Sequence, residues 1–108
     1  MRSEIQHILE KAKRRIVPRF HPQRIILFGS YASGRSGPDS DIDLLIVMDV
    51  KDSTRKMANE IDLLMSDRQI PMDFLVLTPQ QYERQKNIIG TVVHQLEREG
   101  MVIYEKAA

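Results

Sequence analysis

The sequence predicts an α/β or α+β fold in which helices pack on a small mixed sheet. Three observations support this class. Apolar residues recur at helical spacing near the start of the chain, and short aliphatic runs between turn-forming residues indicate buried strands. The two kinds of segment alternate as helix, strand, strand, helix, strand, helix, strand, which favours helices layered on a sheet. The length of 108 residues suits one core, so residues 1–108 are expected to form a single domain.

The first half of the chain is predicted to contain one long helix and two strands. A capping-box pattern and apolar residues at helical spacing predict a helix from Ser3 to about Val17, which Pro18 is expected to end. The apolar run Arg24–Phe28 predicts a buried strand. Residues 29–40 are rich in turn-forming residues, and a short helix is expected near their start. A second strand is predicted over Asp41–Val47.

The elements in the second half of the chain are predicted mainly from helix caps. A helix that ends near Met65 can begin at either Asp52 or Ser53, since both residue types are preferred at helix N-termini. Thr78 followed by Pro79 is a strong helix start, because threonine caps and proline is favoured at the first helical position. The other predicted elements are a strand over Ile70–Leu77, a helix from Thr91 to Glu99 that Gly100 terminates, and a strand over Met101–Tyr104.

Composition excludes several classes of function. The formal net charge is +1, so no overall field attracts nucleic acid, and no direct nucleic-acid binding is expected. The absence of cysteine excludes disulfides, thiolate chemistry and Cys-ligated zinc. No apolar run approaches the roughly 18 residues of a membrane helix, and the first residues lack the pattern of a signal peptide. We therefore expect a cytoplasmic protein that makes no membrane contact.

Two aspartates interrupt the apolar pattern of the second predicted strand. Asp41 and Asp43 are two residues apart, which on a strand places both side chains on one face, about 6.5–7 Å apart along the chain. Neighbouring carboxylates repel each other and raise each other's pKa unless a cation lies between them. A hard divalent cation such as Mg²⁺ suits oxygen ligands of this kind. Alternatively, both aspartates stand at a solvated strand end and have no catalytic role.

A third carboxylate lies near the start of the third predicted strand. Asp73 precedes the apolar residues Phe74 to Leu77. If this strand neighbours the second one, then Asp73 can face the same site. Three carboxylates from two strands can hold two metal ions about 3.5–4 Å apart, an arrangement used in phosphoryl and nucleotidyl transfer. For Asp73 taken alone, the pattern favours a solvated strand end without a catalytic role.

A glycine–serine pair follows the first predicted strand. Gly29 permits positive φ and lets a ligand approach the backbone, and Ser30 offers a hydroxyl at the start of a short helix. Such a turn can bind phosphate through its N–H groups. The spacing fits neither a Walker A loop nor a dinucleotide fingerprint. Taken alone, the pair is more typical of an ordinary tight turn with a helix cap.

The two features together form the pattern Gly-Ser-x10-Asp-x-Asp, from Gly29 to Asp43. This stretch resembles the active-site signature of the DNA polymerase β-like nucleotidyltransferase superfamily. The short chain, the run Ser-Asp-Ile-Asp-Leu and the later Asp73 resemble the minimal nucleotidyltransferases of bacteria and archaea. The resemblance extends from about Ile25 to Tyr104 and implies a polymerase β-like nucleotidyltransferase fold.

The resemblance also implies roles for individual residues. Gly29 and Ser30 would hold the β- and γ-phosphates of a nucleoside triphosphate. Asp41 and Asp43 would bind two Mg²⁺ ions, and Asp73 would complete the metal site and help to deprotonate the attacking hydroxyl. Two further loop residues are candidates from their position alone: Arg35 can reach a triphosphate, and Ser40 can orient Asp41 or simply begin the strand.

The size of the chain and the resemblance together suggest the partner. About 108 residues leave no room for an acceptor-binding domain, so another molecule is expected to bring the acceptor. Minimal nucleotidyltransferases commonly act as antitoxins beside a HEPN-domain ribonuclease toxin, and some transfer AMP from ATP to a tyrosine of that toxin. The resemblance therefore implies an Mg²⁺-dependent protein adenylyltransferase.

Two alternatives remain at this stage. The protein can neutralise its partner by binding alone, through an apolar face. The candidates for this face, which fit a place in the core equally well, are Ile88, Ile89, Val92, Val93 and Leu96. It can also act on a small molecule of the aminoglycoside type, with a cleft formed between two subunits. The sequence does not choose the nucleotide base, since it contains no base-recognition motif.

Overall fold

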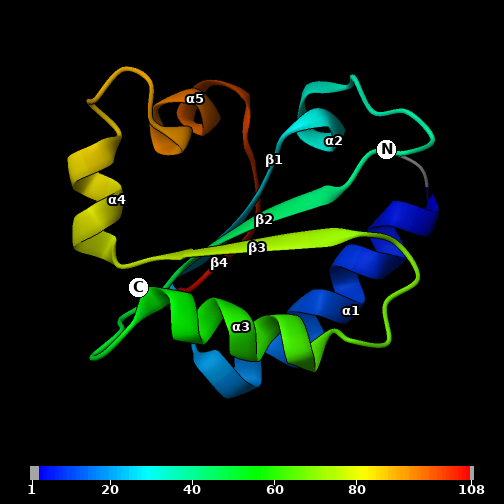
Figure 1. Ribbon diagram of the computed structural model, residues 1–108, viewed down its shortest axis with the longest axis horizontal. Coiled ribbons are helices and arrows are strands. Elements are labelled where there is room, and N and C mark those ends of the chain that lie inside the picture. Colours follow the sequence, from blue (N-terminus) through cyan, green and yellow to red (C-terminus); the bar gives the residue numbers. More distant parts are fainter. Residues whose placement is uncertain (1–2, 108) are drawn as a thin grey trace.

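The computed structural model describes residues 3–107, and within them five helices and four strands alternate along the chain (Figure 1). The layout confirms the predicted mixed α/β class with helices on a small sheet. The elements are α1 (Ser3–Phe20), β1 (Arg24–Phe28), α2 (Ser30–Ser33), β2 (Ile42–Val47), α3 (Thr54–Leu64), β3 (Met72–Leu77), α4 (Pro79–Gln85), α5 (Val92–Glu99) and β4 (Met101–Glu105).

The four strands form one mixed sheet in the order β3-β2-β1-β4. Strand β1 runs antiparallel to both β2 and β4, whereas β2 and β3 are parallel. A parallel pair needs a crossover connection, which α3 provides between these two strands. The start of β2 therefore lies beside the start of β3 and the end of β1, so three chain segments meet at one end of the sheet.

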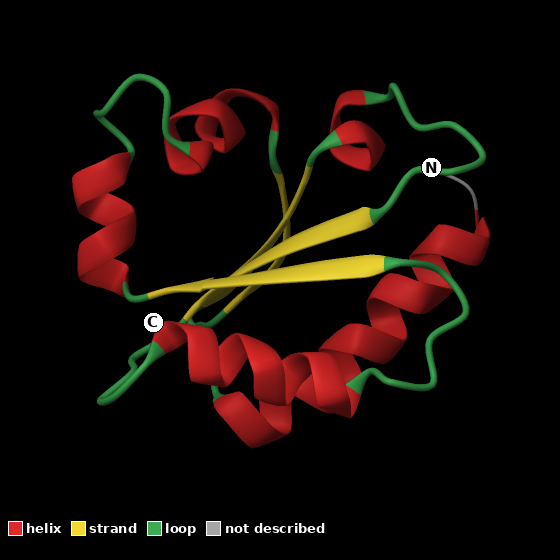
Figure 2. Ribbon diagram, viewed as in Figure 1, coloured by secondary structure: helices red, strands yellow, loops and turns green. Residues whose placement is uncertain are grey.

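Helices α1 and α3 cover one face of the sheet, on the lower side of Figure 2. The buried residues of α1 recur at three- and four-residue intervals, which is the apolar stripe that the sequence predicts. Helix α3 contributes Ile61, and Met65 follows directly after it. The strand residues buried on this face are Ile25, Leu27, Ile42, Leu44, Ile46, Met72 and Val76.

Helices α4 and α5 cover part of the opposite face. A second buried cluster there joins Tyr82, Val93 and Leu96 to the strand residues Ile26, Leu45, Val47 and Leu77. Residues alternate between the two faces of a strand, so Asp43 projects on the same side as Leu45 and Val47. The aspartate-bearing face is thus apolar and buried beyond the first residues of β2, and polar only where the strand begins.

Several predicted boundaries differ from those observed, and β4 ends at Glu105 rather than Tyr104. Helix α1 continues through Pro18 to Phe20 instead of ending before the proline. Proline removes the amide donor that would bond the carbonyl four residues earlier, so the helix lacks one hydrogen bond near its end. The His21 N–H still donates to the Val17 carbonyl at 3.0 Å, and Phe20 packs against the core. These contacts stabilise the final turn.

Both strands that carry aspartates begin later than predicted. Strand β2 starts at Ile42 rather than Asp41, and β3 starts at Met72 rather than Ile70. Pro71 has no N–H to donate, although its carbonyl accepts a hydrogen bond from the Ile42 N–H at 2.9 Å. Pairing between the two strands therefore begins immediately after the proline.

The helix starts predicted in the second half of the chain are confirmed. Ser53 caps α3, and Thr78 and Gln81 form a reciprocal capping box at the start of α4. Thr91 caps α5, which ends at Gly100. Within residues 3–107, none of the helices combines the length and apolar character needed to cross a bilayer.

Candidate active site

The candidate active site lies where β2 and β3 begin. In the parallel register Asp43 is paired with Asp73, and in the antiparallel register it is paired with Phe28 at the end of β1. Paired residues of neighbouring strands project to the same side of a sheet, so Asp43 and Asp73 share one face. Asp41 lies just before β2, two residues from Asp43. The fold thus brings together the three carboxylates that the sequence singles out.

The charges of these carboxylates act on each other. Asp43 is half-buried, and burial raises the pKa of its carboxyl above the usual value, with further increases from the charges of Asp73 and Asp41. Asp41 and Asp73 are exposed. The ion pairs found among residues 3–107 involve none of the three. Ion pairs with basic side chains of this part of the chain therefore do not relieve the repulsion among the three carboxylates. A cation bound here would relieve it.

Gly29 brings backbone against the Asp43 carboxylate. Its φ of 76° and ψ of −156° fall in a region that only glycine adopts readily. A Cβ atom at this position would overlap Oδ2 of Asp43. The glycine at position 29 of the sequence predicts that a positive φ is permitted here. The close approach of this glycine to Asp43 becomes visible only in the structure.

Ser30 begins α2, a single helical turn over the carboxylates. The Gly29 carbonyl accepts hydrogen bonds from the N–H groups of Ala32 and Ser33 at 3.2 and 3.1 Å. The Ser30 carbonyl accepts from the Arg35 N–H at 2.9 Å, and Gly34 ends the turn with φ 79°. The half-buried Ser30 therefore stands in a fixed turn adjacent to Gly29.

The two further nucleotide-binding candidates have other partners in the structure. Arg35 is exposed and forms an ion pair with Glu99 at the end of α5, with 3.5 Å between Nη2 and Oε2. The Ser40 Oγ accepts a hydrogen bond from the Gly37 N–H at 2.8 Å and so closes the loop ahead of Asp41. Sequence patterns contain no indication of Glu99, because it lies in a distant helix.

The carboxylates suit a hard divalent cation in charge and donor type, since all their donor atoms are oxygen. Within the described part of the chain, no three His, Cys, Asp or Glu side chains are arranged to hold a metal ion as they stand. Asp41 and Asp73 are exposed, however, and exposed side chains change rotamer readily. The residues therefore fit a metal site that closes by side-chain rotation.

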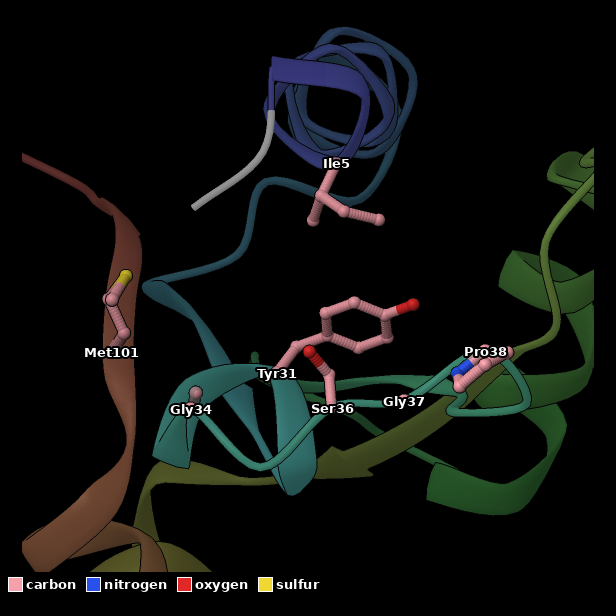
Figure 3. Close-up of a pocket in the computed structure, with 8 residues that line it drawn as sticks. Ile5, Tyr31, Gly34, Ser36, Gly37, Pro38 and Met101 are labelled. Carbon is pink, nitrogen blue, oxygen red and sulfur yellow. The ribbon is translucent and has the colours of Figure 1, made fainter.

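A cavity of about 850 Å³ lies beside α2 and not over the carboxylates. Figure 3 shows the ring of Tyr31 between Ile5 of α1 and Ser36 of the loop, with Met101 of β4 at the side. None of the three aspartates lines this cavity. Tyr31 packs against the buried cluster that α1 and α3 form with the sheet.

A family model described as "Nucleotidyltransferase domain" matches residues 7–98. The match covers most of the chain and includes all three aspartates and the Gly29–Ser30 turn. The chain belongs to the nucleotidyltransferase domain family.

Curated relatives of this nucleotidyltransferase include two proteins of Methanocaldococcus jannaschii, each named "Putative protein adenylyltransferase". One is 43% identical over 47 residues, which cover 44% of this chain and 47% of the relative. The other is 41% identical over 44 residues, which cover 41% of this chain and 51% of the relative. The matched segment thus spans about half the length of each relative.

Two solved structures share the fold. One is a toxin–antitoxin crystal structure with AMP-PNP, with a TM-score of 0.51 and 21% identity over 91% of this chain and 71% of the other. The second is a mutant of the toxin–antitoxin MntA-HpeT, with a TM-score of 0.54 and 21% identity over 93% of this chain and 73% of the other. These similarities confirm the nucleotidyltransferase architecture.

Proposed function

We propose that this nucleotidyltransferase transfers AMP from ATP to a tyrosine hydroxyl of a HEPN-domain ribonuclease toxin and thereby acts as its antitoxin. The observation that supports the proposal most directly is the contact between the Gly29 turn and Asp43, which is itself in register with Asp73. This arrangement puts a glycine–serine turn against a group of carboxylates, and a triphosphate with bound cations requires groups of both kinds. The names of the curated relatives support adenylyl transfer.

In the proposed reaction the tyrosine oxygen attacks the α-phosphorus of ATP. A new oxygen–phosphorus bond forms, the bond from the α-phosphorus to the bridging oxygen breaks, and diphosphate leaves. Asp73 accepts the hydroxyl proton, while the turn at Gly29 and Ser30 holds the β- and γ-phosphates. Arg35 and Ser40 remain candidate nucleotide contacts, and Arg35 would exchange its ion pair with Glu99 for one with phosphate.

Two Mg²⁺ ions would be held by Asp41, Asp43 and Asp73 and would neutralise charge on the transferring and leaving phosphates. The protein's own contribution is then mainly positioning. The half-buried Asp43 is fixed by its strand, and the turn at Gly29 limits how far the triphosphate can move from it. Such positioning reduces the entropy that the reaction must lose.

The direct test is transfer of label to the protein encoded beside this one. The full chain, Mg²⁺ and ATP labelled at the α-phosphate are incubated with that protein, and a parallel reaction uses ATP labelled at the γ-phosphate. Label retained from the α-position alone supports adenylyl transfer. Asp41→Ala combined with Asp43→Ala should abolish it, while Asp39→Asn, a change of an exposed acid in the same loop, should not. Absence of label on the partner contradicts the proposal.

Neutralisation by binding alone is the second candidate function. The observation that favours it is the exposure of Ile88, Ile89 and Val92 between α4 and α5. Val93 and Leu96, which the sequence grouped with them, are instead buried core residues. Under this alternative, the Asp41→Ala and Asp43→Ala variant still forms the complex and still silences the partner although no label is transferred.

A small-molecule acceptor remains the third candidate. In the labelling experiment, label that appears on an added aminoglycoside and not on the partner protein supports it.

A further inference from the structure

Strand β4 is an open edge of the sheet. The order β3-β2-β1-β4 leaves both β3 and β4 with one unpaired side. An unpaired edge presents a row of N–H and C=O groups that can pair with another strand, and monomeric proteins usually protect such edges with charges, prolines or covering side chains. The two edges of this sheet differ in that protection.

The β3 edge carries all three kinds of protection. Pro71 precedes the strand, Asp73 places an exposed charge near its start, and the Arg68 guanidinium lies 5.7 Å from the centre of the Phe74 ring. In contrast, β4 has neither charge nor proline from Met101 to Tyr104. Strand β4 is therefore the edge that can accept a further strand.

Exposed apolar side chains lie on both faces of β4. Met101 is paired with Leu27 and is 45% exposed, whereas Val102 is paired with Ile26 and is 51% exposed. Since Leu27 and Ile26 belong to opposite faces of the sheet, the exposed surface extends around the edge. No exposed large hydrophobic residue of the described chain lies on β3.

The surface between α1 and β4 is also hollowed. The cavity beside α2 and a second cavity of about 610 Å³ meet at Met101, and the second continues along the strand to Ile103 and along α1 to Leu9. Figure 3 shows Met101 at the border of the first cavity, across from Ile5 and Tyr31. The second cavity is also lined by Gln6, His7, Glu10 and Lys13 of α1, so an added strand would meet apolar side chains along β4 and polar ones along the helix.

The charges at the two ends of β4 favour a second copy of the same strand. Arg98 lies in the last turn of α5, just ahead of the strand, and Glu105 is the last residue of β4. The neighbouring Glu99 already forms an ion pair with Arg35. An antiparallel pair of identical strands puts the first end of one copy against the last end of the other, so Arg98 of each copy can approach Glu105 of the other. A parallel pair would put Glu105 against Glu105 and Lys106 against Lys106. The edge is thus complementary to itself in the antiparallel sense.

We propose that two copies of this chain pair antiparallel along β4 and form a continuous eight-stranded sheet. The contact is isologous, with backbone hydrogen bonds between the β4 strands and apolar packing of Met101 and Val102 against the other copy. Because Met101 lines the cavity beside α2, that cavity then borders the interface in both copies. This inference does not depend on the proposed function, because it uses only the sheet edge and its charges.

Analytical ultracentrifugation of the full chain tests the proposal. The wild-type protein should sediment as a dimer of twice the 12.5 kDa chain mass, with Kd below about 100 μM. Val102→Lys should give a monomer. Leu63→Lys is the matched control, because Leu63 is 72% exposed on α3, away from the edge, and should leave the dimer intact. Ile89→Lys tests in the same way whether the α4–α5 surface is the interface instead.

Two further measurements separate lost pairing from lost folding. A mixture of the Val102→Lys and Val102→Glu variants should restore a dimer, since opposite charges then meet near the middle of the paired strands. In the wild-type protein, amide hydrogen exchange of residues 101–105 should slow as protein concentration rises. A wild-type monomer at about 100 μM overturns the proposal. A Val102→Lys dimer, or exchange at 101–105 that does not change with concentration, overturns it equally.

Discussion

At the scale of single residues, the glycines of the loop before β2 differ in what a side chain would meet. Gly29 and Gly34 both have positive φ, of 76° and 79°, but only at Gly29 would a Cβ atom collide with a neighbour, the Asp43 carboxylate. Gly37 has neither constraint, because its φ is ordinary and a Cβ atom there would have no neighbour within 4 Å. Alanine substitutions at these three glycines of one loop therefore separate the effect of backbone strain from that of steric overlap.

We expect stability to fall in the order Gly37→Ala, Gly34→Ala, Gly29→Ala. Gly37→Ala should be close to neutral, and Gly34→Ala should cost about 1–2 kcal/mol because alanine is strained in the left-handed region. Gly29→Ala should add a steric cost of about 1–3 kcal/mol from displacement of Asp43. Urea unfolding of the three variants measures the order.

The same series tests the active-site role of Gly29. Label transfer should be lost in Gly29→Ala and retained in Gly34→Ala at temperatures where both are folded. Equal activity of the two variants would contradict a special role for the contact between Gly29 and Asp43.

Asp43 should matter for transfer but not for folding. Burial and the charges of Asp73 and Asp41 raise its carboxyl pKa, which means that its ionised form is disfavoured in the folded protein. Asp43→Asn should therefore abolish transfer while leaving thermal stability in metal-free buffer unchanged or slightly higher, by less than about 1 kcal/mol. Calorimetry together with the labelling assay checks both readouts. A clear loss of stability would show that the carboxylate has a structural role instead.

At the scale of elements, Tyr82 joins three of them. Its ring is buried on α4, its hydroxyl donates a hydrogen bond to Glu97 on α5, and the Arg24 guanidinium of β1 lies 4.5 Å from the ring centre. Burial, followed by the hydrogen bond to Glu97, raises the pKa of Tyr82 to about 12. The helices that cover the aspartate-bearing face are held to the sheet partly by this arrangement.

Tyr82→Phe should destabilise the fold by about 0.5–1.5 kcal/mol at neutral pH, because Glu97 loses its partner. The pKa sets the alkaline behaviour of the wild-type protein. The folded state keeps the Tyr82 proton above pH 10, where an unfolded tyrosine loses it, so stability falls as the pH rises from 10 towards 12. Absorbance titration of the tyrosinate should show a late-ionising group that is missing in Tyr82→Phe. An unaltered titration in the variant would contradict the assignment.

Helix starts could be predicted from the sequence more reliably than strand starts. The caps at Ser53, Thr78 and Thr91 are local hydrogen bonds between a side chain and the following turn, so nearby residues suffice to predict them. The first paired residue of a strand depends on its neighbour, as Ile42 does on the Pro71 carbonyl. The continuation of α1 past Pro18 depends on Phe20 packing against distant core residues, which no local pattern contains.

At the scale of the whole molecule, the site is a product of strand order. The spacing of Asp41 and Asp43 predicts a shared face, but whether Asp73 joins them requires β3 to lie beside β2 in the observed register. A slip of one residue would turn Asp73 to the opposite face. The residue types of the candidate site could therefore be predicted from the sequence. The convergence of the three carboxylates and the ion pair between Arg35 and Glu99 could be seen only in the folded structure.

Binding of Mg²⁺ and ATP should stabilise the whole chain, because a ligand that binds only the folded state adds its binding free energy to stability. At about 100 times Kd the gain is about 2.7 kcal/mol.

We expect a rise in Tm with Mg²⁺ and ATP together, and a smaller rise with Mg²⁺ alone through relief of repulsion among the aspartates. Asp43→Asn should lose most of both increases, whereas Asp39→Asn should keep them, since Asp39 is an exposed acid outside the carboxylate group. Thermal unfolding monitored by circular dichroism measures these shifts in the wild type and in both variants. If the Asp43→Asn chain is stabilised as much as the wild type, the cation and nucleotide bind elsewhere, because the aspartates at the start of β2 and β3 then contribute nothing to the affinity.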